Sequence, residues 1–122
     1  MSQISLALFT GALTLSGLPA IAQGIAPGCD KDLAAVDASF EETQARLQKA
    51  ARADQTEKCA AIRHHVEVMA NGINVFQRCQ PEGHDKGENI GQLGASIGDF
   101  LDISDQQGCP RFALPKIDLP PQ

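Results

Sequence analysis

Two side chains that could bind a soft metal ion together lie four residues apart in the chain. On a helix, His65 and Met69 would share one face, and imidazole with thioether is a ligand pair that suits copper. Met69 also belongs to an apolar repeat, where methionine is an ordinary core residue, and metal sites usually need three or four ligands. We therefore expect no bound metal or other cofactor, with a copper site at His65 and Met69 as the alternative. His84 lies in a predicted loop, with nothing that places it near His65.

The residues available for hydrolytic chemistry form no recognisable catalytic motif. Ser39, Ser96 and Ser104 lie outside any G-x-S-x-G turn. Most carboxylates fall at predicted helix starts or on polar faces, where capping and solvation explain them. The chain has five Phe and neither Trp nor Tyr, which is a poor inventory for an aromatic sugar-binding cleft. The sequence predicts that the protein is not an enzyme.

Four cysteines, Cys29, Cys59, Cys79 and Cys109, fall at predicted helix boundaries. Their intervals are too long for a paired-ligand zinc site or a C-x-x-C redox motif. Four cysteines allow three pairings, but a helix of about 20 residues is roughly 30 Å long and a disulfide needs Cα atoms within about 7 Å. In an antiparallel bundle, only Cys29–Cys79 and Cys59–Cys109 join neighbouring ends. We predict these two disulfides.

Three apolar repeats with steps of three and four residues predict the helices that carry the cysteines. They fall between residues 30 and 52, 54 and 79, and 85 and 108, with no alternating strand pattern anywhere in the chain. Short connections make neighbouring helices antiparallel. The predicted fold class is all-α: an antiparallel three-helix bundle cross-linked by two disulfides.

Helix-capping signals mark two of the helix starts. Asp54 with Glu57, and Asp85 with Glu88, have the three-residue spacing of a capping box. Pro81 prevents the second helix from extending far beyond Cys79. Asn71-Gly72 in the second helix predicts a kink, or even a break into two shorter helices.

The first 22 residues read as a secretory signal peptide. They carry no charge, contain an apolar run over residues 4–18, and end on Ala-Ile-Ala at 20–22, an A-x-A cleavage pattern. The alternative is an uncleaved N-terminal anchor, and the absence of Lys and Arg from the segment argues against both interpretations equally. We expect a helical domain over 23–110, a proline-rich extended tail over 111–122, a periplasmic or secreted location, and no stable membrane insertion after cleavage.

The charge balance excludes one large class of partner. The net charge is −5, and nucleic-acid binding favours basic patches with aromatic stacking surfaces. We therefore expect no nucleic-acid partner.

A stripe of glycines on the third predicted helix is the least ordinary feature of the sequence. Each glycine inside a helix lowers the stability of that helix by about 1 kcal/mol relative to alanine. Four glycines on one helix therefore need a structural or functional reason. We favour close approach of a neighbouring helix. The alternatives are a shallow groove for a partner segment or apolar ligand, and a helix that forms only on binding. The stripe consists of Gly87, Gly91, Gly94 and Gly98.

These features together predict an exported, non-enzymatic module that acts by binding a protein partner, as an interaction module, inhibitor or chaperone does. The alternative is a carrier of a soft metal ion or a small apolar ligand. In the tail, Leu114, Ile117 and Leu119 either cover an apolar flank of the bundle or present it to a partner.

Overall fold

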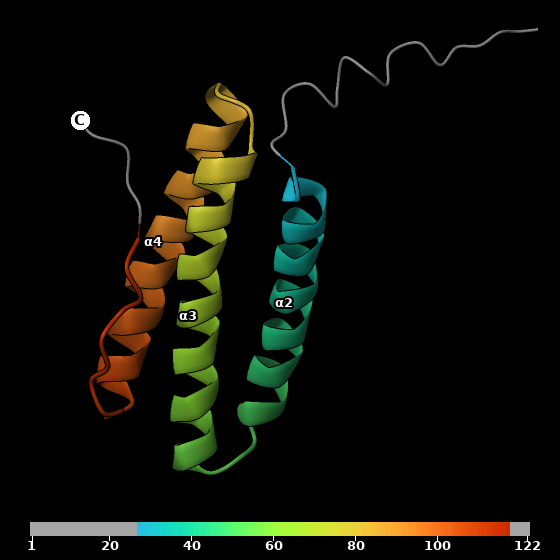
Figure 1. Ribbon diagram of the computed structural model, residues 1–122. Coiled ribbons are helices and arrows are strands. Elements are labelled where there is room, and N and C mark those ends of the chain that lie inside the picture. The colour runs from blue at the N-terminus through green and yellow to red at the C-terminus, as the bar shows by residue number, and fades with distance from the viewer. Residues whose placement is uncertain (1–26, 118–122) are drawn as a thin grey trace, which may run out of the picture.

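Three helices form the part of the chain that the computed structural model describes, residues 27–117 (Figure 1). They are α2 (Cys29–Ala50), α3 (Gln55–Cys79) and α4 (His84–Gln106), and residues 27–117 contain no strand. The predicted all-α bundle is confirmed. The predicted signal peptide and Leu119 lie outside the described residues.

Two disulfides staple opposite ends of this bundle. Cys29–Cys79 joins the start of α2 to the end of α3, with Cα atoms 5.3 Å apart. Cys59–Cys109 joins the second turn of α3 to the segment after α4, with Cα atoms 5.5 Å apart. Both predicted pairings are confirmed, because four-residue connections between the helices make the neighbours antiparallel.

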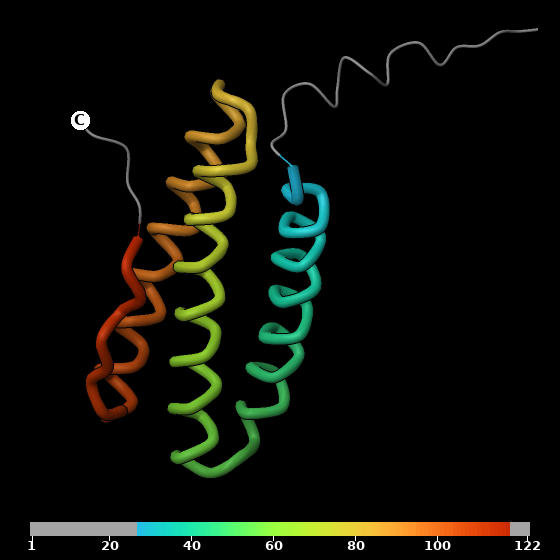
Figure 2. The backbone as a smooth tube through the Cα atoms, in the orientation of Figure 1, coloured from blue at the N-terminus to red at the C-terminus, as the bar shows by residue number. Residues whose placement is uncertain are grey.

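The central helix is α3, which contacts both of the others (Figure 2). Its apolar face, together with Ile97 of α4, forms the main core of Val66, Met69, Ala70, Ile73 and Ile97. The Cα atoms of α2 and α4, by contrast, stay more than 8 Å apart. Helices α2 and α4 therefore lie on either side of α3 without close backbone contact between them.

The two predicted helix caps have different outcomes. Asp54 is the N-cap of α3, and its carboxylate accepts a hydrogen bond of 2.9 Å from the Glu57 backbone N–H, as expected. The Asp85 cap is wrong, because α4 starts one residue earlier, at His84, with Gly83 as its N-cap. Gly83 turns the chain with φ of 149°, a conformation that glycine adopts most readily. Asp85 therefore lies within the first turn of α4, and this helix start has no side-chain cap hydrogen bond.

The predicted break at Asn71-Gly72 does not occur, since α3 continues through both residues to Cys79. Gly72 is buried, and the ring of Phe40 from α2 lies over it. A Cβ atom built on Gly72 would be 2.9 Å from the Cζ atom of Phe40. The glycine therefore makes room for an aromatic ring and does not interrupt the helix.

None of the helices within residues 27–117 has the length and apolar character needed to cross a membrane. The same part of the chain holds two disulfides and no free cysteine. Such cross-links fit an oxidising or extracellular compartment.

Candidate functional site

A groove runs between α2 and α4, with α3 as its floor, and we call it the α2–α4 groove. Its first hollow, of about 490 Å³, lies toward the Cys29–Cys79 end and is contacted by all three helices. Apolar side chains from each helix line its interior, and polar ones form its rim. The lining residues are Leu33, Asp37, Phe40, Phe76, Gln80, Asn89, Gln92 and Leu93.

A second hollow, of about 300 Å³, lies in the same groove toward the Cys59–Cys109 end. Ile103 on its α4 side is 38% exposed and is one of two large apolar side chains exposed within residues 27–117. The lining again comes from all three helices: Leu47, Ala50, Ala51, Lys58, Ile62, Phe100, Ile103 and Gln107. The groove therefore presents apolar surface at both ends.

Between the two hollows, His65 of α3 connects α2 to α4 through its side chain. Its Nδ1 atom lies 2.8 Å from the hydroxyl oxygen of Thr43 on α2. Its ring meets the ring of Phe100 on α4 edge-on, with centroids 4.7 Å apart. The Thr43 hydroxyl donates to the Phe40 carbonyl at 3.2 Å. The donor and acceptor roles in the contact between Thr43 and His65 depend on the tautomer of the imidazole ring.

Burial lowers the pKa of His65 from its ordinary value of 6.5, and the neighbouring His64 lowers it further. The side chain is 6% exposed and therefore loses most of the hydration that would stabilise an imidazolium. His65 is neutral at pH 7. It acts as a packing and hydrogen-bonding link to α2 and α4 between the two hollows.

We expect the free energy of unfolding to fall as the pH drops below about 6.5. In that range His65 takes up a proton in the unfolded chain, while its lowered pKa keeps it neutral in the folded protein. Above pH 6.5 both states are neutral and this contribution to the pH dependence disappears. Urea unfolding at about pH 7.5 and about pH 5, compared with a His65→Gln variant that cannot titrate, measures the effect. Identical pH dependence in the two proteins would contradict it.

The copper alternative receives no support from these surroundings. His65 uses Nδ1 in its contact with Thr43, and Met69 is a core residue with 3% exposure. Within residues 27–117, one group of His, Cys, Asp and Glu side chains lies close enough together to share an ion. His65 does not belong to that group. The interpretation of His65 and Met69 as core and boundary residues fits this packing.

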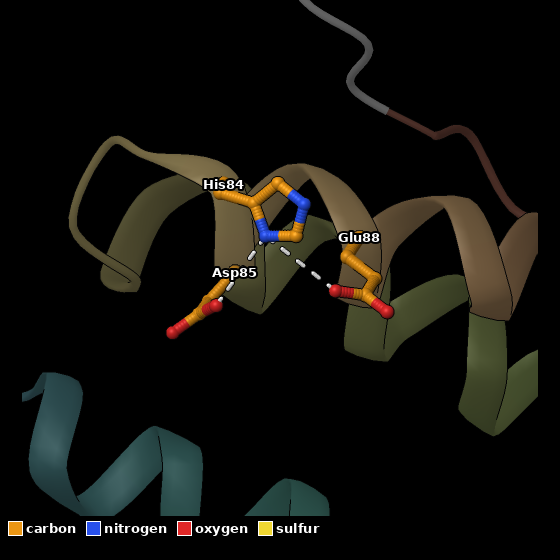
Figure 3. A group of neighbouring side chains, drawn as sticks. All are labelled: His84, Asp85 and Glu88. Atoms are coloured by element: carbon orange, nitrogen blue, oxygen red, sulfur yellow. Dashed lines mark ion pairs between the residues drawn. The ribbon is translucent and has the colours of Figure 1, made fainter.

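That cluster lies at the start of α4 and consists of His84, Asp85 and Glu88 (Figure 3). The Nδ1 atom of His84 lies 3.6 Å from a carboxylate oxygen of each partner. All three side chains are open to solvent, with exposures of 86%, 98% and 52%. The positive end of the α4 dipole also opposes a cation at this position. The arrangement amounts to a solvated set of weak ion pairs.

The glycine stripe faces solvent. No heavy atom beyond the immediate surroundings in α4 lies within 4 Å of a Cβ atom built on any of its four members. The favoured explanation, close approach of a neighbouring helix, is therefore wrong, since neither α2 nor α3 packs against these glycines. The stripe as a partner surface stays a prediction. Its residues, all exposed, are Gly87, Gly91, Gly94 and Gly98.

The α2–α4 groove is the feature that sequence reasoning missed. Its lining residues, such as Phe40 and Leu93, belong to the apolar repeats that predict the helices, but a repeat does not report how far apart two helices stand. Comparison of the chain with known protein-family models, with curated proteins and with solved structures gives no match. The geometry of the groove therefore stands as the basis for a functional assignment.

Proposed function

We propose that this protein is an exported, non-enzymatic binding module that receives an apolar helix of a partner protein in the α2–α4 groove. One observation carries the proposal: α2 and α4 flank α3 without packing against each other, so apolar side chains of all three helices border open space. A helix laid in an apolar groove between helices is a recurrent mode of peptide recognition. Such a helix would add the fourth member of a bundle.

The separation of the two hollows sets the expected spacing of the partner's anchor residues. Gln92 lines the first hollow and Ile103 the second, and their sequence separation of eleven corresponds to about 17 Å along α4. A partner helix with large apolar side chains at positions i and i+11, three turns apart, would fill both hollows. Asp37 on the rim of the first hollow favours a cationic residue beside that anchor.

Export is supported by the two disulfides, which fit an oxidising compartment, and by the signal-like composition of the first 22 residues. The polar groups that border the groove, such as Gln92 and Asn89, are suited to hydrogen bonding at a rim. They supply no nucleophile paired with a base. A binding role therefore accounts for the groove better than a catalytic one.

Site-specific photocrosslinking in the native compartment tests the proposal. We expect a crosslinking amino acid at Gln92 or Asp37, both exposed on the groove rim, to give a protein adduct. Adding Ile103→Glu, which places a charge in the second hollow at an already exposed position, should reduce the adduct at least about tenfold. Peptide mass spectrometry of the adduct then checks for apolar residues at i and i+11.

Glu42 is the matched control, because it is exposed and borders a surface lined by α2 and Arg52, with no residue of α3 or α4 in the lining. Equal adducts at Glu42 and Gln92 would contradict groove binding. Adducts confined to Ala95, an exposed residue between Gly94 and Gly98, would move the partner surface to the glycine stripe. Native mass spectrometry that detects a bound small molecule, together with the absence of any protein adduct, would favour the apolar-ligand carrier.

A further inference from the structure

The chain after α4 turns back as a strap, which we define as residues 109–117 and which lies beside α4 in Figure 2. Side chains of α3 also contact it. Cys109 is bonded to Cys59 at one end, and the Lys116 carbonyl accepts a 2.8 Å hydrogen bond from the Asn74 side chain at the other. The fifteen residues from Cys59 to Asn74 cover about 22 Å of helix. Seven strap residues cover the same length, which corresponds to an extended, polyproline-like chain.

The strap covers apolar surface that α3 and α4 leave open. Phe112 and Ile117 are partly buried against the main core, which includes Val66 and Ile97. The guanidinium of Arg63 lies over the Phe112 ring, 5.4 Å from its centroid. Leu114, midway between these anchors, is 40% exposed. Of the predicted tail residues, Ile117 thus covers the bundle and Leu114 faces solvent.

The two disulfides differ in how far solvent reaches them. Cys29 and Cys79 are each 1% exposed, whereas Cys59 and Cys109 are both partly exposed. A hollow of about 320 Å³ opens beside Cys59, with Arg63 and Phe112 also in its lining. Thiol–disulfide exchange requires a thiolate to reach a sulfur atom. The hollow beside Cys59 gives such access, whereas Cys29 and Cys79 are shielded from solvent.

We propose that the Cys59–Cys109 disulfide is a redox-sensitive latch that holds the strap on α3 and α4. A thiolate of a dithiol reductant attacks the Cys59 sulfur, forms a mixed disulfide and releases Cys109 as the leaving thiolate, which takes up a proton. The second thiol of the reductant then resolves the mixed disulfide. Two electrons pass from the dithiol, which becomes a cyclic or internal disulfide, to the protein, which gains two thiols.

Release at Cys109 leaves the strap with its non-covalent contacts alone. These contacts come from two partly buried side chains and the hydrogen bond to Asn74. The buried Cys29–Cys79 disulfide continues to join α2 to α3. Reduction thus uncovers the α3–α4 surface under Phe112 and Ile117, while the α2–α3 pair stays linked.

Partial reduction of the mature protein tests the latch. The protein is equilibrated with increasing dithiothreitol, thiols are blocked with N-ethylmaleimide, and tryptic peptides are measured by mass spectrometry. Cleavage after Lys31, Lys58, Arg63, Arg78, Lys86 and Arg111 places each cysteine in its own peptide. We expect half-maximal labelling of Cys59 and Cys109 at a dithiothreitol concentration at least about tenfold lower than for Cys29 and Cys79.

Amide hydrogen exchange on the half-reduced protein supplies the second measurement. Exchange should become faster mainly over residues 63–74 and 109–117, with a smaller change over 33–43, because loss of this disulfide also lowers the stability of the whole domain. A Cys59→Ser/Cys109→Ser variant should reproduce this pattern without reductant. Reduction of both disulfides at the same concentration, prior reduction of Cys29–Cys79, or unchanged exchange in the strap would each overturn the proposal.

Discussion

Replacing Cys29 and Cys79 together with alanine is expected to lower the free energy of unfolding by about 4 kcal/mol. The disulfide closes a loop of 50 residues, so its loss returns a large amount of conformational freedom to the unfolded chain. Because small domains have a total stability of about 5–15 kcal/mol, this change removes a large share of it. Urea unfolding followed by circular dichroism at the helix band measures the difference.

The second disulfide is a matched control for this experiment. Cys59 and Cys109 also close a loop of 50 residues, so the chain-entropy contribution is the same in a Cys59→Ala/Cys109→Ala variant. Cys29 and Cys79, however, also lie in a core cluster with Val36 and Val75, and their truncation removes packing contacts as well. The first variant should therefore be the less stable of the two. A loss below about 1 kcal/mol in both would show that helix packing alone maintains the fold.

The disulfide pairing was predictable because it depends on lengths alone. Cys59 and Cys79 lie near opposite ends of α3, a helix of 25 residues, and are therefore too far apart to form a disulfide with each other. Antiparallel neighbours then leave one arrangement. The apolar repeats likewise predict the core, since Val66, Met69 and Ile73 occupy it as their spacing requires.

The α2–α4 groove was not predictable, because it depends on how widely two helices stand apart. Phe40 belongs to the apolar repeat of α2, and that repeat is the same whether the ring enters a closed core or borders a groove. His65 shows the same limit: its sequence neighbours place it beside the core, but its partner Thr43 comes from another helix, 22 residues away. Contacts between helices decide both roles.

The glycines of α3 and α4 are alike in sequence but differ in their neighbours, so they predict opposite responses to one substitution. Gly94 is exposed within α4, with nothing within 4 Å of a built Cβ. Gly94→Ala should therefore raise the free energy of unfolding by about 0.5–1 kcal/mol, through helix propensity and the reduced freedom of the unfolded chain. Gly91 has the same open surroundings and should respond in the same way.

Gly72→Ala should instead lower the free energy of unfolding by about 1 kcal/mol. The new methyl group would lie 2.9 Å from the Phe40 ring, and overpacking of this kind typically costs about 1–3 kcal/mol, against a propensity gain of about 1 kcal/mol. A Phe40→Leu background removes the overlapping ring atoms, so a double-mutant cycle should show Gly72→Ala becoming less destabilising there. Stabilisation by Gly72→Ala comparable to that of Gly94→Ala would mean that Phe40 is not held over Gly72. The floor of the α2–α4 groove would then lack the fixed shape that recognition of a partner helix requires.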